Sequence, residues 1–323
     1  MSTIGYADLL ALGPVRGYLA RVEERLAADV AWVGGSTAAT AAETLAAGGK
    51  RLRPLLVLLS APAARQGGED LVRAGSAVEL VHMATLVHDD VLDHAALRRG
   101  RPTVWAQHGE RVAGATGDML FARAFGVLAE TDDIECLSLL AQAALGLSEG
   151  EALQMLQTRE PETTPERYFE RCTLKTGRLF AAACALGGRL GGLEPADVDA
   201  LAEYGRLLGL AFQVADDILD CEGTADATGK AVGTDLIGGT ATLPLLYAAA
   251  REPRIADALR TQPAPDDVPA LLALVGETGA LDDARDAARE LVRSAEESLD
   301  RVTGDLDTAP LRMVVRGVVD RDT

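Results

Sequence analysis

The stretch ATLVHDDVLD at residues 84–93 decides the fold, because in it an apolar run ends in a cluster of three aspartates. A close echo, AFQVADDILD, stands at residues 211–220. Apolar residues recur at helical spacing through both stretches and before them, so each cluster is expected near the end of a long, buried helix. An echo this short is weak support for internal duplication. It indicates two matching chemical sites.

Each cluster places two carboxylates on one helix face. Positions i and i+4 share a face, so Asp89 goes with Asp93 and Asp216 with Asp220. Like charges at this spacing destabilise a helix, and the C-terminal end of the macrodipole disfavours anions. A hard cation such as magnesium offsets that cost and also binds substrate phosphates. A solvated acidic helix end is the less favoured alternative, because unpaired charge beside a buried helix is costly.

The rest of the chain continues the helical pattern. Apolar residues recur with a helical period at residues 76–92, 133–157, 198–221 and 280–302. The sequence has no sustained alternation of β-branched residues, so we predict an all-α fold without a sheet. Glycine and proline clusters separate the helices, and none is long enough to be a domain linker. We therefore expect residues 1–323 to form a single-domain helical bundle.

The composition excludes several classes of protein. A net charge of −18 argues against a nucleic-acid partner, because phosphate backbones are bound by basic surfaces. The four cysteines have no C-x-x-C spacing, so we expect reduced thiols rather than disulfides or zinc ligands. The N-terminus does not resemble a signal peptide, and the longest apolar runs, such as residues 55–64, are shorter than a membrane span. We expect a cytoplasmic protein.

Two basic segments are unusual in so acidic a chain. GGKRLRP at residues 48–54 precedes an expected helix, and RRGR at residues 98–101 follows the first aspartate cluster. Arginine forks suit diphosphate oxygens, and lysine adds a point charge, so these segments indicate a second anion site that needs no metal. Surface charge or helix capping is the alternative. KTG at residues 175–177 and GK at residues 229–230 are weaker signals of the same kind.

Together these segments resemble the trans-polyprenyl diphosphate synthase family over about residues 45–247, and the ordered set is highly specific. The matching segments are residues 48–54, 79–93, 97–103, 117–118, 150–154, 175–176, 212–220, 229–236 and 242–244. The resemblance implies an isoprenoid-synthase fold, in which antiparallel helices surround a deep apolar cavity with both aspartate clusters at its mouth. It also implies a homodimer.

The resemblance further assigns roles to individual residues. About three magnesium ions would be held by Asp89, Asp93 and Asp216, with Asp90, Asp217 and Asp220 in support. The allylic diphosphate would be contacted by Arg98, Lys175, Thr176, Gln213 and Lys230. Isopentenyl diphosphate would be bound by Lys50, Arg53, His82 and Arg99. His82 alone would more often be a core histidine. The chain departs from the family at Thr240, where a lysine is usual, which puts one allylic contact in doubt.

The implied reaction joins isopentenyl diphosphate head to tail to an allylic diphosphate. Metal and cationic side chains stabilise the departing diphosphate, the isopentenyl double bond attacks the allylic cation, and a proton is lost. Small residues stand below Asp89, namely Val81, Ala84 and Thr85, where bulky ones would stop growth early. We therefore expect a medium or long product, hexaprenyl to decaprenyl, whose release could involve transient membrane contact.

Three alternatives stay open. A short-chain synthase making farnesyl or geranylgeranyl diphosphate would share the same motifs. A class I terpene cyclase usually has an N-D-x-x-S-x-x-x-E second motif and many cavity aromatics, whereas this chain repeats D-D-x-x-D and is only 4% aromatic. A non-catalytic partner subunit would tend to lack the metal ligands, and all of them are present in the sequence.

Overall fold

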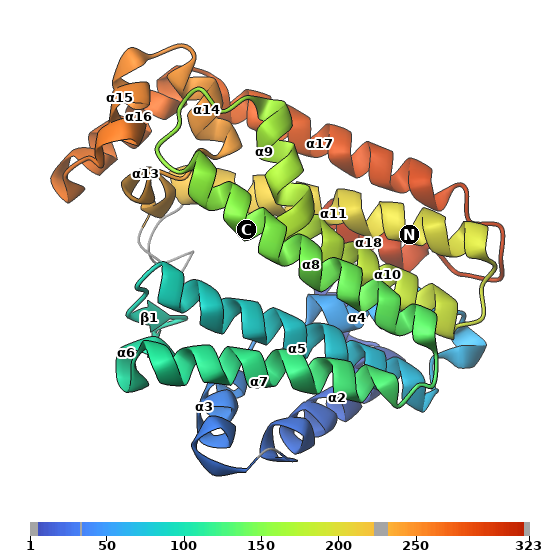
Figure 1. Ribbon diagram of the computed structural model, residues 1–323. Coiled ribbons are helices and arrows are strands. Elements are labelled where there is room, and N and C mark those ends of the chain that lie inside the picture. Colours follow the sequence, from blue (N-terminus) through green and yellow to red (C-terminus); the bar gives the residue numbers. More distant parts are fainter. Residues whose placement is uncertain (1–5, 33, 223–231, 320–323) are drawn as a thin grey trace. The chain divides into compact units, whose positions relative to one another are not determined.

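The structure, a computed structural model, describes residues 6–32, 34–222 and 232–319, and helices dominate it (Figure 1). The α-helices are α1 (Tyr6–Ala11), α2 (Gly13–Trp32), α3 (Gly35–Ala46), α4 (Leu52–Leu59), α5 (Glu69–Leu92), α6 (Val104–His108), α7 (Glu110–Ala129), α8 (Ile134–Gln157), α9 (Pro165–Cys172), α10 (Arg178–Leu190), α11 (Pro195–Glu222), α13 (Thr234–Gly238), α14 (Leu243–Ala249), α15 (Pro253–Thr261), α16 (Val268–Glu277), α17 (Ala280–Leu299) and α18 (Ala309–Val319). Short 3₁₀ turns stand at Ala63–Arg65 and Pro265–Asp267, and a π-helical turn at Thr173–Gly177. The all-α prediction is confirmed.

The chain forms two compact units, each built from separate stretches of sequence. The first unit comprises Met1–Ala144, Leu179–Gly205 and Ser298–Val314, and the second comprises Leu145–Arg178, Arg206–Glu297 and Val315–Thr323. The long helices α8 and α11 each contribute a part to both units. The first aspartate cluster belongs to the first unit and the second cluster to the second. That the whole chain acts as one domain stays a prediction.

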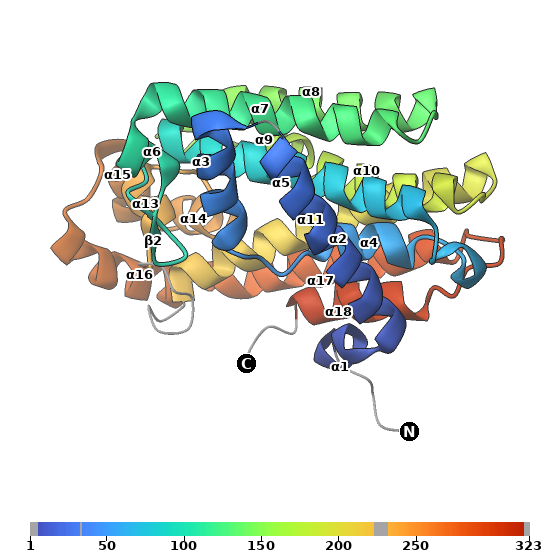
Figure 2. The same cartoon turned by 90° about the horizontal axis from the view of Figure 1, so that it is seen from below.

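Helix α5 is the centre of the first unit. It packs most extensively against α7 and also contacts α4 and α2 (Figure 2). Its side chains are buried on almost every face, as expected for a helix that is apolar all round. Gly75 is required because a Cβ there would lie 2.2 Å from the hydroxyl of Tyr18 in α2. That hydroxyl donates to the carbonyl oxygen of Leu71 at 2.9 Å, which ties α2 to α5.

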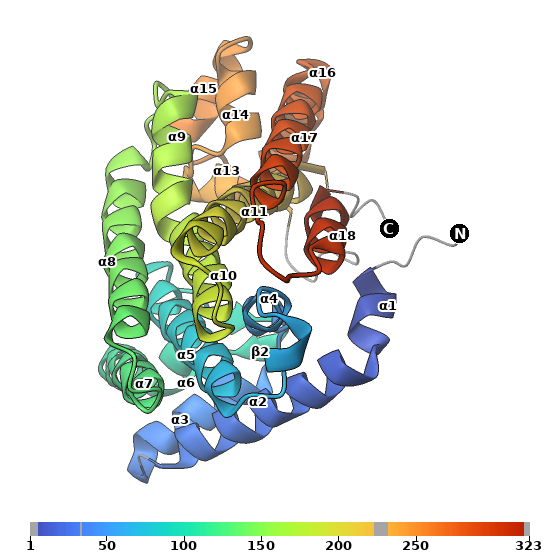
Figure 3. The same cartoon turned by 90° about the vertical axis from the view of Figure 1, so that its right-hand side faces the viewer.

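The second unit has its own apolar core. Helices α9, α14, α15 and α16 pack together, and the C-terminal half of α11 and most of α17 contribute buried side chains to the same core (Figure 3). Tyr168 of α9 is among the largest fully buried side chains in the described structure. The core therefore surrounds the end of the helix that carries the second aspartate cluster.

Both clusters stand near helix C-termini, as predicted. Helix α5 ends at Leu92 with Asp93 as its C-cap, and α11 ends two residues after Asp220. The expectation of no sheet missed a small hairpin, in which β1 (Leu97–Arg98) pairs antiparallel with β2 (Arg101–Pro102). Its turn residues, Arg99 and Gly100, both have positive φ, as a type I′ turn needs. Strands of two residues are too short for a periodic pattern to reveal.

Helix α7 is both long and apolar. Among the described helices it alone has the length and apolar composition of a membrane span. Part of its apolar surface packs inside the first unit, where Leu120, Ala124 and Leu128 are fully buried, and 39% of the apolar window is buried in all. The core helix of a soluble protein passes the same test of length and composition.

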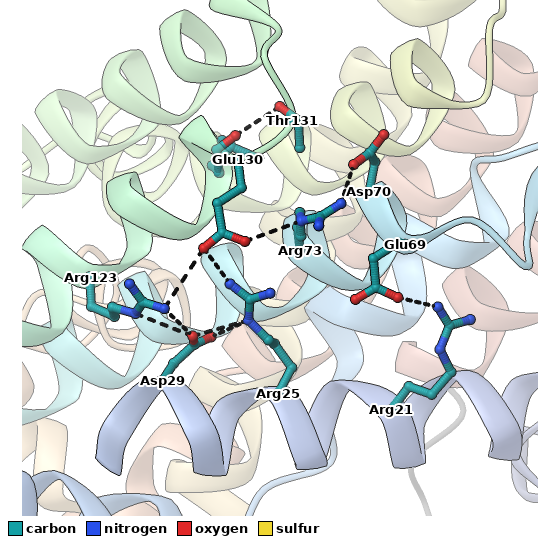
Figure 4. Close-up of polar contacts among 10 residues, drawn as sticks. Arg21, Arg25, Asp29, Glu69, Asp70, Arg73, Arg123, Glu130 and Thr131 are labelled. Atoms are coloured by element: carbon teal, nitrogen blue, oxygen red, sulfur yellow. Dashed lines mark hydrogen bonds and ion pairs between the residues drawn. The ribbon is translucent and has the colours of Figure 1, made fainter. Parts of the chain in front are cut away.

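A polar network joins α2, α5 and α7 (Figure 4). Asp29 of α2 is buried and accepts from Nε of Arg25 at 3.0 Å and from Nη2 of Arg123 at 2.7 Å. Glu130 after α7 binds Arg25 at 2.6 Å and Nε of Arg73 in α5 at 3.2 Å. Because Asp29 is buried, the network depends on that carboxylate to balance two guanidinium groups.

Replacing Asp29 by alanine is expected to lower the free energy of unfolding by about 3 kcal/mol, because two partly buried guanidinium groups lose their buried carboxylate partner and keep only the more exposed Glu130. Glu69→Ala is the matched control. It removes a surface ion pair in which the side chain of Glu69 is 51% exposed and that of Arg21 is 39% exposed. The free energy of unfolding is expected to fall by less than about 1 kcal/mol. Urea denaturation followed by circular dichroism measures both. Equal losses in the two variants would contradict the prediction.

Candidate active site

A pocket of about 320 Å³ lies in the first unit beside the first aspartate cluster. Its walls come from the end of α3, the basic segment after it, helix α5, the β1–β2 hairpin and α6. The charged and ionisable lining residues are four arginines, one histidine and three carboxylates, namely Arg51, Arg98, Arg99, Arg101, His82, Glu43, Glu79 and Asp90. In a chain of net charge −18, this pocket gathers cations, so it is suited to a multiply charged anion.

The glycine pair before the basic segment lets two guanidinium groups approach the backbone. Gly48 has φ +76, and its carbonyl oxygen accepts a hydrogen bond from Nη1 of Arg99. A Cβ on Gly49 would lie 3.0 Å from Nη1 of Arg51 and 3.2 Å from Nη1 of Arg99. A larger residue at position 49 would therefore require both guanidinium groups to shift by a few tenths of an ångström.

Arg51 is held by two carboxylates. Its guanidinium donates from Nη1 to Glu79 at 2.8 Å and from Nε and Nη2 to Glu23 of α2. Arg51 and Glu79 are both buried, and Arg51 takes a left-handed backbone with φ 49. Two carboxylates neutralise Arg51, so it shapes the pocket, whereas Arg99, which bonds to the backbone carbonyl oxygen of Gly48, is better placed to supply charge to a ligand.

Burial shifts the pKa of His82, which lines the pocket, and of Arg53, which lies in the neighbouring basic segment. Burial and the neighbouring Arg53 and Arg99 hold the pKa of His82 well below its usual value, so the imidazole is neutral at pH 7. Burial lowers the pKa of Arg53 to about 10, and its guanidinium lies 4.5 Å from the ring centroid of Phe180 in α10. Neutral His82 can donate one N–H to an oxygen without adding charge.

The middle aspartate of the first cluster points inward. Asp90 is 5% exposed and accepts from Nε of Arg98 in β1 at 2.8 Å. This bond fixes the hairpin against the end of α5. Asp93 is exposed, and Asp89 is half-buried.

The contacts of His88 explain the Gly117-Asp118 pair on helix α7. Its Nε2 lies 3.3 Å from Oδ1 of Asp118 in α7, and its ring stacks on Phe121. A Cβ on Gly117 would lie 2.3 Å from Nε2 of His88. The glycine of the Gly117-Asp118 pair therefore makes room for the histidine that precedes the first cluster.

The second cluster resembles the first, because its middle aspartate is buried and bonded within the protein while its first aspartate is accessible to solvent. Asp217 is 2% exposed and accepts from the Tyr168 hydroxyl at 2.6 Å and from Nε2 of Gln213 at 2.9 Å. Burial raises the pKa of Asp217 to about 7, against the hydrogen bonds from Tyr168 and Gln213, which lower it. Asp220 accepts from the backbone N–H groups of Thr234 and Asp235 and so caps α13. Asp216 is exposed.

A π-helical turn at Thr173–Gly177 presents two further predicted residues. The ammonium group of Lys175 pairs with Glu151 of α8, and the Thr176 hydroxyl donates to Oε1 of Gln213 at 3.0 Å. A Cβ on Gly150 would lie 2.5 Å from the backbone nitrogen of Lys175, so this glycine allows α8 to pack directly against the turn. Turns of this kind are often found at functional sites.

The comparisons with known proteins agree with this geometry. The profile of the family described as Polyprenyl synthetase matches residues 36–275. An octaprenyl diphosphate synthase from Haemophilus influenzae is 36% identical over 258 residues, covering 78% of each chain. Component 2 of a heptaprenyl diphosphate synthase from Geobacillus stearothermophilus is 42% identical over 234 residues, covering 72% of this chain and 73% of that protein. The chain belongs to the polyprenyl synthetase family.

A solved structure carries the likeness over the full length. The polyprenyl synthase from Caulobacter crescentus CB15, complexed with calcium and isoprenyl diphosphate, has a TM-score of 0.87 at 36% identity and covers 100% of both chains. Membership of the polyprenyl synthetase family confirms the predicted enzyme class, a trans-prenyltransferase with the isoprenoid-synthase fold. The heptaprenyl and octaprenyl enzymes among the relatives support the predicted medium or long chain.

The structure groups the predicted residues of this polyprenyl synthetase in two sets. His82, Arg98 and Arg99 line the pocket of the first unit. Lys50 is exposed and Arg53 half-buried, and neither belongs to the pocket lining. Lys175, Thr176, Gln213 and the second cluster lie together in the second unit. The roles of all these residues stay predictions.

Some predicted residues lie elsewhere. Lys230 falls outside the described residues. Thr240, which replaces the usual lysine, lies after α13 with its N–H bonded to the carbonyl oxygen of Asp235 at 2.8 Å. Val81 and Ala84 are fully buried in α5, and the Thr85 hydroxyl donates to the carbonyl oxygen of His82 at 2.8 Å. None of these three chain-length candidates lines the pocket.

Several residues of the site were missed from the sequence. They are Glu23, Glu79, His88, Glu151 and Tyr168. Glu79 stands three residues before His82 on an apolar helix, and a buried carboxylate there signals a cationic partner. Tyr168 had no comparable signal, because an isolated tyrosine on an amphipathic helix is an ordinary core residue.

Proposed function

We propose that the chain condenses isopentenyl diphosphate with an allylic diphosphate, with the help of Mg²⁺, to give an all-trans polyprenyl diphosphate of medium or long chain. The observation that carries the proposal is the cationic pocket beside the first aspartate cluster in an otherwise acidic chain. The related structure from Caulobacter crescentus, which holds calcium and isoprenyl diphosphate, supports a divalent metal and a diphosphate ligand.

The carboxylates available fit magnesium. Asp89, Asp93 and Asp216 would hold the ions, and they offer hard oxygen donors at partly or fully exposed positions. The described residues include no group of three or more His, Cys, Asp or Glu side chains close enough to form a metal site of their own. Magnesium commonly keeps several waters and takes only one or two carboxylates together with substrate phosphates. When bound, the metal would neutralise the charge on the departing diphosphate.

The residues of the first unit would bind isopentenyl diphosphate. Arg99 would supply a guanidinium fork to the diphosphate, and neutral His82 one N–H. The Glu23–Arg51–Glu79 cluster keeps the wall rigid, so these donors are positioned before the ligand arrives. Lys50, at an exposed position of the same segment, and Arg53 would complete the binding set.

The residues of the second unit would bind the allylic diphosphate. Lys175 would exchange its contact with Glu151 for phosphate oxygens, and Gln213 would donate an N–H. Thr176 and Lys230 complete the proposed set from this unit, and the resemblance to the family assigns Arg98 of the first unit to the same diphosphate. These donors would stabilise the charge that develops as the carbon–oxygen bond breaks.

Purified protein incubated with Mg²⁺, isopentenyl diphosphate and each allylic primer in turn tests the proposal. Elongated polyprenyl diphosphates should form only when both substrates are present. Hydrocarbon formed from an allylic diphosphate alone would favour a terpene cyclase. A chain that gives no product until a second protein is added would be a partner subunit.

Product length is expected to shorten when Ala84 is replaced by phenylalanine. Ala84 stands five residues before Asp89, and one helical turn rises about 5.4 Å, close to one isoprene unit, so a ring there would block the growing chain. Chromatography of radiolabelled products measures the change. Ala74→Phe also overpacks a fully buried position of α5, four turns from the cluster, and should leave the length distribution unchanged. Unchanged product length in both variants would show that the side chain at position 84 does not limit chain growth.

We also propose two interactions of the protein, with a second copy of itself and with a membrane. The resemblance of the chain to its family supports a homodimer, which size-exclusion chromatography with light scattering would test. A long polyprenyl product is strongly apolar, so we propose transient contact with a membrane during product release in the cytoplasm.

A further inference from the structure

A continuous chain of hydrogen bonds runs through the second unit. The Tyr168 hydroxyl donates to Oδ2 of Asp217 at 2.6 Å, and the other carboxylate oxygen of Asp217 accepts from Nε2 of Gln213 at 2.9 Å. The Thr176 hydroxyl donates to Oε1 of Gln213 at 3.0 Å. The chain therefore joins α9, α11 and the π-helical turn.

These bonds fix the orientation of one amide group. The oxygen of Gln213 accepts from the Thr176 hydroxyl and its nitrogen donates to the Asp217 carboxylate. A flipped amide would place its oxygen against the carboxylate, which has no proton to donate when ionised, so the Asp217 contact sets the orientation. One of the two N–H bonds of Gln213 is used by Asp217, and the second has no partner among the described residues. That second N–H is the donor available to a ligand.

By donating to Asp217, Tyr168 prevents this carboxylate from accepting both N–H groups of the Gln213 amide. Tyr168 is fully buried and Asp217 is 2% exposed, so solvent cannot satisfy the carboxylate. Without the phenol, Oδ2 of Asp217 would lack its partner, and the amide nitrogen of Gln213 is already bonded to the same carboxylate. Reorientation of Gln213 toward Asp217 would remove its donor from the ligand.

We propose that Tyr168 is a positioning residue that holds Gln213 in the orientation needed to bind the allylic diphosphate. The inference rests on the proposed function, in which Gln213 contacts that diphosphate. Tyr168 itself is buried behind Asp217 and does not touch substrate. Its effect passes through two hydrogen bonds.

The test replaces Tyr168 by phenylalanine, which removes one oxygen atom and keeps the packing. The KM for the allylic diphosphate should rise about tenfold, because a hydrogen bond to a charged group contributes enough to change an equilibrium by that factor. The KM for isopentenyl diphosphate should not change. In calorimetric titrations with inorganic diphosphate and MgCl₂, the Kd should rise by the same factor.

Tyr204→Phe is the matched control. Tyr204 is also fully buried, and its hydroxyl donates at 2.6 Å to the carbonyl oxygen of Leu311 in the first unit. Both phenylalanine variants should lower the Tm, but only Tyr168→Phe should change substrate affinity. Thr176→Val removes the donor at the other end of the chain and should also raise the KM for the allylic diphosphate, which provides a second test if Tyr168→Phe fails to fold. Because Thr176 also belongs to the proposed binding set, its effect supports the inference only if it disappears in a Gln213→Ala background.

A double-mutant cycle separates positioning from general destabilisation. In a Gln213→Ala background, Tyr168→Phe should leave the KM for the allylic diphosphate unchanged, because its effect acts through Gln213. Additive effects of the two substitutions, or a normal affinity in Tyr168→Phe, would overturn the inference. The diphosphate titration does not need turnover. Wild-type protein that binds diphosphate but makes no polyprenyl product would count against the proposed function alone.

Discussion

Replacing Asp216 by asparagine is expected to lower kcat/KM about a thousandfold. The substitution keeps the size of the side chain but removes the negative charge of an exposed ligand near the end of α11. A loss of about 4 kcal/mol of charge stabilisation in the transition state corresponds to that factor, because each 1.36 kcal/mol changes the rate tenfold. Steady-state kinetics over a range of Mg²⁺ concentrations measures the effect, and the Mg²⁺ requirement should rise.

Asp282→Asn is the control for this variant. Asp282 lies in the same unit, its side chain is 82% exposed, and its carboxylate pairs with Arg285 on the surface of α17. Its loss should leave kcat/KM within about twofold of wild type, as for most surface substitutions. If kcat/KM fell by less than tenfold in Asp216→Asn, Asp216 would not hold a catalytic metal.

Chelation of divalent metal is expected to abolish turnover, and added Mg²⁺ to restore it. The proposed ligands are carboxylates at helix ends, and magnesium bound by one or two carboxylates exchanges with solution. The cationic donors of the pocket would remain, but they would not neutralise the carboxylates that face the diphosphate. Radiolabel incorporation with EDTA, and then with excess MgCl₂, measures the effect.

The fold should survive chelation. The cores of both units consist of apolar side chains, so far-UV circular dichroism should stay unchanged in EDTA. Mg²⁺ should raise the Tm strongly only together with inorganic diphosphate, because ligand and metal bind as a set. Full activity in EDTA would refute a metal-dependent mechanism.

The helices that carry the clusters were predictable because their patterns are long. Helices α5 and α11 each run for more than twenty residues, and their apolar residues recur at helical spacing up to the aspartates. The sequence also indicated an anion site in the basic segments. It did not indicate the hairpin, since two-residue strands leave no period to detect.

The contacts that orient the site could not be predicted. Arg51 meets carboxylates 28 residues away on both sides, and Tyr168 meets Asp217 49 residues away. Such pairings depend on tertiary packing, which local spacing does not encode. Two glycines gave a partial indication of these close contacts. Gly117 and Gly150 stand where a neighbouring group comes too close for a Cβ.

The two clusters also show why like residues need not act alike. From the sequence, all three aspartates of each cluster were assigned to metal, directly or in support. In the structure, Asp90 and Asp217 are buried and bind Arg98 and Tyr168. A helix end that exposes its first aspartate turns the next one about 100° away, so the two neighbours face different surroundings.

The π-helical turn at Thr173–Gly177 limits which changes of length the surrounding segment can tolerate. In a regular α-helix, residue i+8 points about 80° away from residue i. The wider turn absorbs that difference, so Tyr168 and Thr176 both reach α11 from the same side. Deleting one residue would restore regular winding and break one of the two bonds, whereas many substitutions would keep both. Insertions and deletions should therefore be rarer between these two residues than changes of side chain.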